Sequence, residues 1–261
     1  MKVTCLQMDI RFCRPQESFS HVAELIGQAM ADKPDVLVLP EAWNTGFAPH
    51  AGMHILADRD GVRVKAEIGA LAKQFGVNIV AGSVSDLRDG KLYNTAYVFD
   101  RQGCCTASYD KIHLFSPSGE DRHYTAGNQI CRFQLDGVNC GLVICYDIRF
   151  PELTRTLTVP GIDVLFVVSQ WPASRTFHLS SLITARAIEN QIFLVCCNAC
   201  GSDGKSTCGG NSAIIDPWGK TLAQAGEQES LLTAQLDFSI LQKIRTSINV
   251  FADRRPELYR M

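Results

Sequence analysis

The stretch CGLVICYDIRFPE, residues 140–152, joins an apolar run to a polar turn and a proline. The run at 141–144 predicts a short strand buried in a sheet. It stops at Cys145, and a short helix is predicted over 151–158. A cysteine at such a strand end would project its sulfur from the rim of the sheet, within reach of a substrate. The amide of Tyr146, at the start of the turn, could then face a developing oxyanion.

The same turn also fits a purely structural role. Free cysteine is among the most buried residue types, and Asp147 and Arg149 could form a structural ion pair. Two upstream segments favour a catalytic role for Cys145 instead. The segment VLVLPE at 36–41 is an apolar strand that ends in Glu41, and YDKIHLF at 109–115 places Lys111 among strand-like residues. A glutamate, a lysine and a cysteine, each near a strand end, form a coherent set for acyl transfer.

This set, in this order, resembles the nitrilase (carbon–nitrogen hydrolase) superfamily. The segments ARAIENQ at 185–191 and DPWG at 216–219 are similar to later motifs of the family, so the resemblance covers nearly the whole chain. The run CYDIRFPE at 145–152 most resembles the omega-amidase-like branch. The resemblance implies an α/β fold, a four-layer α-β-β-α sandwich with mixed sheets, and a single carbon–nitrogen hydrolase domain over residues 1–261. It also implies a homodimer or higher homo-oligomer, with the helices after Phe150 and around 179–190 at the interface.

The chemistry needs no metal or organic cofactor. A free thiol titrates near pH ~8.5, so a base must remove the proton at neutral pH, and Glu41 is the candidate. Lys111 and the Tyr146 amide are candidate donors to the oxyanion, one such donor being worth about 3 kcal/mol. Ammonia would leave a thioester on Cys145, which water then hydrolyses. In the family a second glutamate follows the lysine and lies shortly before a glycine. The segment EDRHYTAG at 120–127 fits this pattern, so the resemblance implies that Glu120 orients Lys111.

The substrate is less well defined by the sequence. Trp171, at a predicted strand end, could form an apolar wall of the pocket. Arg149 and Arg175 suit a substrate carboxylate, because a guanidinium matches that geometry, although each could instead form a structural ion pair. The omega-amidase-like branch hydrolyses terminal amides of small dicarboxylates such as 2-oxoglutaramate. Deaminated glutathione, N-carbamoyl compounds and nitriles remain open as alternatives.

Composition limits the partners. The net charge of −2 and the pI near 6.3 give no electrostatic reason to expect nucleic acid or an anionic membrane as a partner. Residues 1–9 lack the apolar core of a signal peptide, and no apolar run reaches the ~18 residues of a membrane helix. The eleven cysteines therefore predict reduced thiols in the cytoplasm.

Three other sequence features suggest alternative functions. The competing class is a thiol-rich metal-binding or redox module, because Cys197 and Cys200 form a CxxC. No second CxxC exists, so we expect the cysteines to be core and loop thiols. The segment GSDGKS at 201–206 is not a phosphate loop, because Ala199 stands where the first glycine is required. A cysteine–histidine hydrolase that uses His113 is also conceivable, yet it explains fewer residues.

Periodicity and turn residues outline the remaining elements. Helices are predicted over 18–30, 63–75, 174–190 and 238–248, the last with Asp237 as its N-cap. Asp136-Gly137 predicts a hairpin turn between 130–135 and 139–145. The long aperiodic loop at 115–129 is of a length that is more often functional than accidental.

Overall fold

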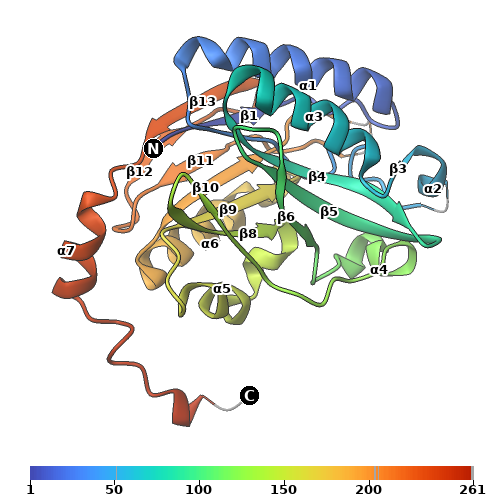
Figure 1. Cartoon of the computed structure of the whole chain (residues 1–261). Coiled ribbons are helices and arrows are strands. Elements are labelled where there is room, and N and C mark those ends of the chain that lie inside the picture. The colour runs from blue at the N-terminus through green and yellow to red at the C-terminus, as the bar shows by residue number, and fades with distance from the viewer. Residues whose placement is uncertain (51, 203, 205, 260–261) are drawn as a thin grey trace.

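The computed structural model describes residues 1–50, 52–202, 204 and 206–259. Two β-sheets lie face to face, and helices cover the outer face of each sheet (Figure 1). Helices α1 (Pro15–Ala29) and α3 (Val62–Phe75) pack on the first sheet, and α5 (Pro151–Thr158) and α6 (Thr176–Asn190) pack on the second. Both sheets contain parallel and antiparallel pairs. The predicted α/β sandwich of four layers with mixed sheets is thus confirmed.

The strands of each sheet come from distant parts of the chain. The first sheet has the order β13-β1-β2-β4-β5-β6, with β3 beside β4, and the second has the order β12-β11-β10-β9-β8-β7. The first comprises β1 (Lys2–Gln7), β2 (Val36–Val38), β3 (Asp58–Arg59), β4 (Asn78–Arg88), β5 (Lys91–Phe99), β6 (Cys105–Asp110) and β13 (Ser230–Gln235). The second comprises β7 (Cys131–Leu135), β8 (Val138–Ile144), β9 (Val164–Ser169), β10 (Phe193–Asn198), β11 (Ala213–Ile215) and β12 (Thr221–Gln224).

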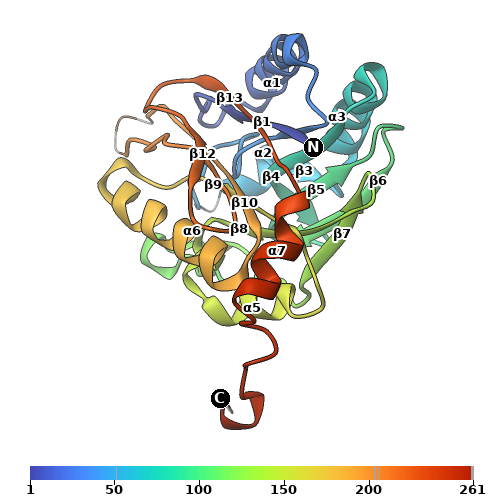
Figure 2. The ribbon, with the colours of Figure 1, turned by 90° about the vertical axis from the view of Figure 1, so that its left-hand side faces the viewer.

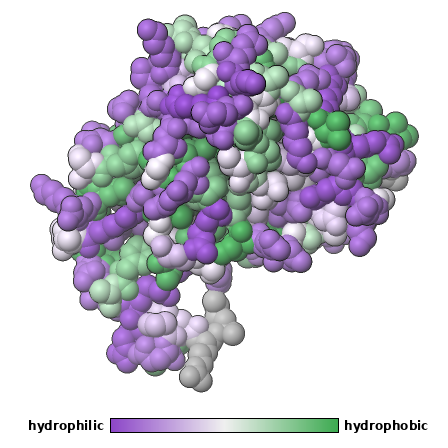
Figure 3. Space-filling model, in the orientation of Figure 1, coloured by the Kyte–Doolittle hydropathy of each residue, from purple (hydrophilic) through white to green (hydrophobic). Residues whose placement is uncertain are grey.

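Alternating side chains along the central strands fill two separate layers of core. In β1, Val3 and Cys5 face the other sheet, whereas Leu6 packs among the residues of α1 and α3. In β9, Phe166 lies between the sheets and Leu165 faces α5 and α6. Strands covered on both faces read as continuous apolar runs, which explains why these segments show no polar alternation. The outer surfaces of α1 and α3 are largely hydrophilic (Figure 3).

The observed elements follow the predicted ones closely, with a few differences. The hairpin turn has positive φ at both Asp136 and Gly137, as its sequence predicts. The loop predicted at 115–129 contains the one-turn helix α4 (Glu120–His123), and the segment before α3 contains α2 (Met53–Leu56). Neither helix was predicted, because a single turn is too short to show periodicity. Helix α7 (Ser239–Ser247) has Phe238 as its N-cap, whereas the sequence predicted Asp237. Asp237 lies one residue before the N-cap, and its side chain accepts the Ser239 amide.

The end of the chain leaves the body of the molecule. After α7, the segment to residue 259 runs outward and ends far from both sheets (Figure 2). It carries Leu258 and Tyr259, which are 67% and 55% exposed. Among the described helices, none is long and apolar enough to cross a membrane.

Candidate active site

Four predicted residues meet where strands of the two sheets end. Glu41 follows β2 of the first sheet, Lys111 follows β6, and Cys145 follows β8 of the second sheet. Glu120 begins α4, which lies over them. The amide of Glu41 donates to the carbonyl of Ser169, at the end of β9, with an N···O distance of 3.4 Å. This bond ties the edge of one sheet to the other, so the structure brings all four predicted residues to one place.

Lys111 stands between the two glutamates. Its Nζ lies 2.8 Å from Oε1 of Glu41 and 3.0 Å from Oε2 of Glu120, and all three side chains are fully buried. Burial alone would lower the pKa of Lys111, but the charges of Glu41 and Glu120 outweigh it and raise that pKa. Lys111 therefore stays cationic and acts as a hydrogen-bond donor. Burial raises the pKa of Glu120, against the opposing charge of Lys111.

Cys145 occupies a strained turn beside this charged group. Its φ of +47° lies in the left-handed region, which costs a non-glycine residue about 1–2 kcal/mol. Burial, followed by the Glu41 charge, raises the pKa of its thiol well above the usual value, and the thiol lies beside the Glu41 carboxylate. The thiol is therefore protonated at rest and has a carboxylate in contact to accept its proton. Tyr146 stands in the first turn of the 3-10 helix Cys145–Arg149, where backbone N–H groups lack an intrahelical acceptor.

Asp147 holds the turn after Cys145 and does not pair with Arg149. Its buried carboxylate accepts the amides of Ile144 and His113 at 3.0 and 2.9 Å. It also bonds to the His113 ring at 2.8 Å and accepts the Tyr109 hydroxyl at 2.8 Å. The structural pair considered from the sequence is therefore wrong, because the 3-10 turn directs Asp147 back toward its own strand. His113 is engaged by Asp147 through Nδ1 and stacks on Phe150, which speaks against its use as the base for Cys145.

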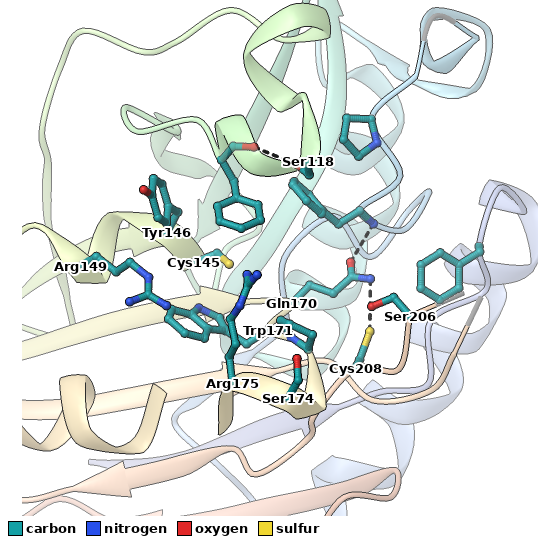
Figure 4. Close-up of a pocket in the computed structure, with 15 residues that line it drawn as sticks. Ser118, Cys145, Tyr146, Arg149, Gln170, Trp171, Ser174, Arg175, Ser206 and Cys208 are labelled. Atoms are coloured by element: carbon teal, nitrogen blue, oxygen red, sulfur yellow. Dashed lines mark hydrogen bonds between the residues drawn. The ribbon is translucent and has the colours of Figure 1, made fainter. Parts of the chain in front are cut away.

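A cavity of about 350 Å³ opens in front of Cys145 (Figure 4). Trp171 forms part of its wall, as predicted, and its amide donates to Asn198. Arg149 lies over the Trp171 ring with 4.6 Å between the guanidinium carbon and the ring centroid, and Arg175 lies over Phe115 at 5.2 Å. Within the described ranges, neither arginine has a carboxylate within 4 Å, so the alternative of structural ion pairs is wrong for both. Two guanidinium groups without a carboxylate partner in the described ranges thus border the cavity that contains the thiol, and Arg149 also contacts Nδ1 of His178 at 3.3 Å.

Two further site residues were missed at the sequence level. Asn94, in the middle of β5, donates from Nδ2 to Glu41 at 2.9 Å and to Glu120 at 3.1 Å. Gln170 donates its amide to Oε2 of Glu41 at 3.0 Å, accepts the Phe47 amide on its side chain at 2.8 Å, and contacts the Cys208 sulfur at 3.3 Å. A buried asparagine within an apolar strand is the one local signal that could have marked Asn94. Nothing local marks Gln170, because its partners are far away in sequence.

The remaining cysteines behave as core and surface residues. All eleven are free thiols, and Cys197 and Cys200 of the CxxC are buried. Burial raises the pKa of Cys200 to about 12 and raises that of Cys197 as well, so neither is a ready thiolate ligand. Within the described residues, no group of three or more His, Cys, Asp or Glu side chains is arranged to hold a metal ion.

A thiol in contact with a carboxylate, beside a fixed cation and an apolar cavity, is the arrangement of a cysteine-dependent acyl-transfer enzyme. Known proteins agree with this class. The carbon-nitrogen hydrolase family model matches residues 2–246. The chain is 43% identical over 257 residues to the 2-oxoglutaramate amidase of Bacillus subtilis (strain 168), with 98% of each chain covered. It is 36% identical over 221 residues to the omega-amidase YafV of Escherichia coli (strain K12), with 84% of each covered.

A solved structure extends the comparison to the fold. An amidase from Nesterenkonia sp. AN1 superposes with a TM-score of 0.88 at 25% identity, covering 99% of this chain and 95% of that one. That structure, of a variant, carries the acetamide moiety of fluoroacetamide covalently on its active-site cysteine. The chain described here belongs to the carbon–nitrogen hydrolase family and is an enzyme of that family, as its resemblance to the nitrilase superfamily implies.

Proposed function

We propose that this enzyme is an omega-amidase that uses Cys145 as its nucleophile and releases ammonia from the terminal amide of a small, carboxylate-bearing substrate. The observation that carries the proposal is the geometry around one cavity. A protonated thiol lies beside a buried carboxylate, a fixed cation stands beside that carboxylate, and two arginines without a carboxylate partner among the described residues border the same space. The names of the two relatives, a 2-oxoglutaramate amidase and an omega-amidase, support this substrate class.

The reaction follows from the positions of these groups. Glu41 accepts the Cys145 proton while the sulfur bonds to the amide carbon. Lys111 and the Tyr146 amide donate hydrogen bonds to the resulting oxyanion, where one donor is worth about 3 kcal/mol. Glu41 then gives the proton to the nitrogen, the C–N bond breaks and ammonia leaves a thioester. Water attacks that thioester, Glu41 takes its proton, and the proton returns to sulfur as the carboxylic acid leaves. Glu120 holds Lys111 in place throughout.

Substitution of Cys145 tests the nucleophile. We expect Cys145→Ala to abolish ammonia release and to leave the urea unfolding curve close to that of the wild type. Cys104→Ala is the matched control, because Cys104 is exposed and is not among the residues that line the cavity. Ammonia release near the wild-type rate by Cys145→Ala would contradict the proposal, and so would an equal loss in both variants.

A substrate panel tests the role of the arginines. The panel comprises 2-oxoglutaramate, succinamate, deaminated glutathione, N-carbamoyl amino acids and simple nitriles. Arg149→Gln and Arg175→Gln should each raise KM for the carboxylate-bearing amides by about tenfold, because a charge-assisted guanidinium–carboxylate bond is lost. Their KM for propionamide, which has no carboxylate, should not change. A preference of the wild type for propionamide or for a nitrile would overturn this substrate class.

The cellular setting and assembly form part of the same proposal. We infer a cytoplasmic homodimer built on a single carbon–nitrogen hydrolase domain over residues 1–261. The eleven free cysteines support a reducing compartment. Val159, just after α5, and Phe177 and Ile188 of α6 are 47%, 78% and 48% exposed, which suits burial against a second copy. Light scattering should report at least a dimer, whereas a fully active monomer at micromolar concentration would refute the assembly.

A further inference from the structure

A second depression lies on the other side of the segment that walls the catalytic cavity. Phe47 and Pro49 line the cavity with Cys145, whereas His50 lines this second space, which has a volume of about 390 Å³. Its walls come from the segment around α2, from the β4–β5 turn and from the end of α4. These three elements lie at the same end of the molecule (Figure 1). The mechanism proposed above makes no use of this space.

The lining of the second depression is strongly basic. It contains Lys91, Arg122, and three of the six histidines of the chain, His50, His54 and His123. Of the residues that the structure describes, no aspartate or glutamate lines it, and neither Lys91 nor Arg122 forms a salt bridge there. A gathering of five basic groups is unusual in a chain with a net charge of −2. Like charges held together repel one another unless an anion joins them.

The chemistry of these groups selects an anion over a cation. Lys91 and Arg122 are cationic at neutral pH, and a histidine ring offers an N–H donor in either protonation state. The Gly52 amide donates to Nδ1 of His50, which leaves the other ring nitrogen of His50 as the N–H donor of the neutral ring. Within the described part of the chain the histidines are not grouped so as to hold a metal. Several donors converge on one space in which no described lining residue carries a carboxylate, which suits a compact polyanion.

The depression is connected to the catalytic residues through short, hydrogen-bonded links. Arg122 and His123 belong to the same helical turn as Glu120, which holds Lys111. The amide of Thr125, two residues beyond His123, donates to the carbonyl of Leu92, which follows Lys91. An anion that bridges Lys91 and Arg122 would therefore fasten α4 to the start of β5.

We propose that this depression binds a small polyanion of the phosphate or tricarboxylate type, and that the bound anion braces α4 and with it Glu120. The site is distinct from the cavity that contains Cys145, because the two spaces share no lining residue. It is independent of which amide the enzyme hydrolyses. Pyrophosphate and citrate are the two probes, since one supplies phosphoryl oxygens and the other carboxylates, and their comparison distinguishes the two sources of negative charge.

Isothermal titration at constant ionic strength tests the site. The pocket variant is Lys91→Gln with Arg122→Gln, and the matched control is Lys73→Gln with Arg132→Gln, which removes the same charge from exposed residues elsewhere. We expect the pocket variant to bind the preferred probe about tenfold more weakly, the order expected for two exposed charge pairs, and the control to bind as the wild type does. Equal weakening in both variants, no weakening in either, or no binding of either probe would overturn the proposal.

Amide hydrogen exchange tests the bracing of α4. In the wild type and the control, the preferred probe should slow exchange of the amides at 119–125, whereas the pocket variant should show no slowing at the same probe concentration. Unchanged exchange in the wild type at saturating probe would overturn the bracing. Slowing that persists in the pocket variant would assign the effect to anions in the catalytic cavity and would overturn it as well.

Discussion

Asp147 offers the sharpest test of how the turn at Cys145 is held. Its two carboxylate oxygens accept the Ile144 and His113 amides and bond to the His113 ring and the Tyr109 hydroxyl. Asp147→Asn keeps the shape but replaces one oxygen by an NH2 group. Whichever way the amide is turned, one buried backbone N–H loses its acceptor, at a cost of about 1–3 kcal/mol. The other bonds lose their charge and about half of their strength.

We therefore expect Asp147→Asn to lower the free energy of unfolding by about 3 kcal/mol in urea titrations. Ammonia release should fall in folded protein too, because the bond between Asp147 and the Ile144 amide closes the turn that keeps Cys145 at a positive φ. Tyr109→Phe is the control: it removes one donor, leaves the carboxylate three partners, and should cost only about 1 kcal/mol. A stability of Asp147→Asn within about 0.5 kcal/mol of the wild type would refute this reasoning.

Three further outcomes are expected. Burial and the Glu41 charge raise the pKa of the Cys145 thiol, so the thiolate fraction grows only at high pH, and the rate of Cys145 alkylation by iodoacetamide should still be rising above pH 9. Gly82→Ala should destabilise the fold by more than about 2 kcal/mol and impair turnover, because a Cβ there would lie 2.0 Å from the carbonyl oxygen of Pro40, next to Glu41. Glu120→Gln should lower kcat more than it raises KM, because it removes a charge that holds Lys111, the proposed oxyanion donor, and in the proposed reaction does not touch the substrate.

Each of these outcomes has a result that would contradict it. A plateau of the alkylation rate below pH 8 would mean that the thiolate forms readily at rest. Gly27→Ala is the control for the glycine, since no atom lies within 4 Å of a Cβ built there, and equal effects of the two substitutions would refute the argument from close contact. A rise in KM alone for Glu120→Gln would place this residue in substrate binding.

The sequence predicted the parts of the site that carry local signals. Glu41 and Cys145 each end an apolar run, and this places a reactive side chain at the rim of a sheet whatever the order of the strands. Lys111 was predicted within a strand-like segment, and the structure puts it one residue beyond β6. Glu120 could be selected only from the family resemblance, because α4 is a single turn without periodicity. Its position over Lys111 depends on contacts across the loop.

Residues whose role depends on the meeting of two sheets could not be predicted. Asn94 reaches both glutamates because β5 lies two strands away from β2, and Gln170 reaches Glu41 across the gap between the sheets. No spacing along the chain encodes either approach. For Arg149, closeness to Asp147 in sequence suggested an ion pair, yet Asp147 bonds to Ile144, His113 and Tyr109 instead. Arg149 instead packs on Trp171, a residue of another strand end.

In the proposed reaction, the buried charges of the site give the two glutamates different tasks. Lys111 is shared by Glu41 and Glu120, and the charges of both raise its pKa against the effect of burial. When Glu41 takes the thiol proton it becomes neutral, and the attraction that holds Lys111 toward it disappears. The negative charge has then moved to the oxyanion, so Lys111 exchanges one anionic partner for another without entering water. Glu120 keeps the ammonium in reach during this exchange, because its own carboxylate is fixed by the Phe115 amide and by Asn94. The second glutamate thus allows the base to lose its charge while the oxyanion donor keeps its place.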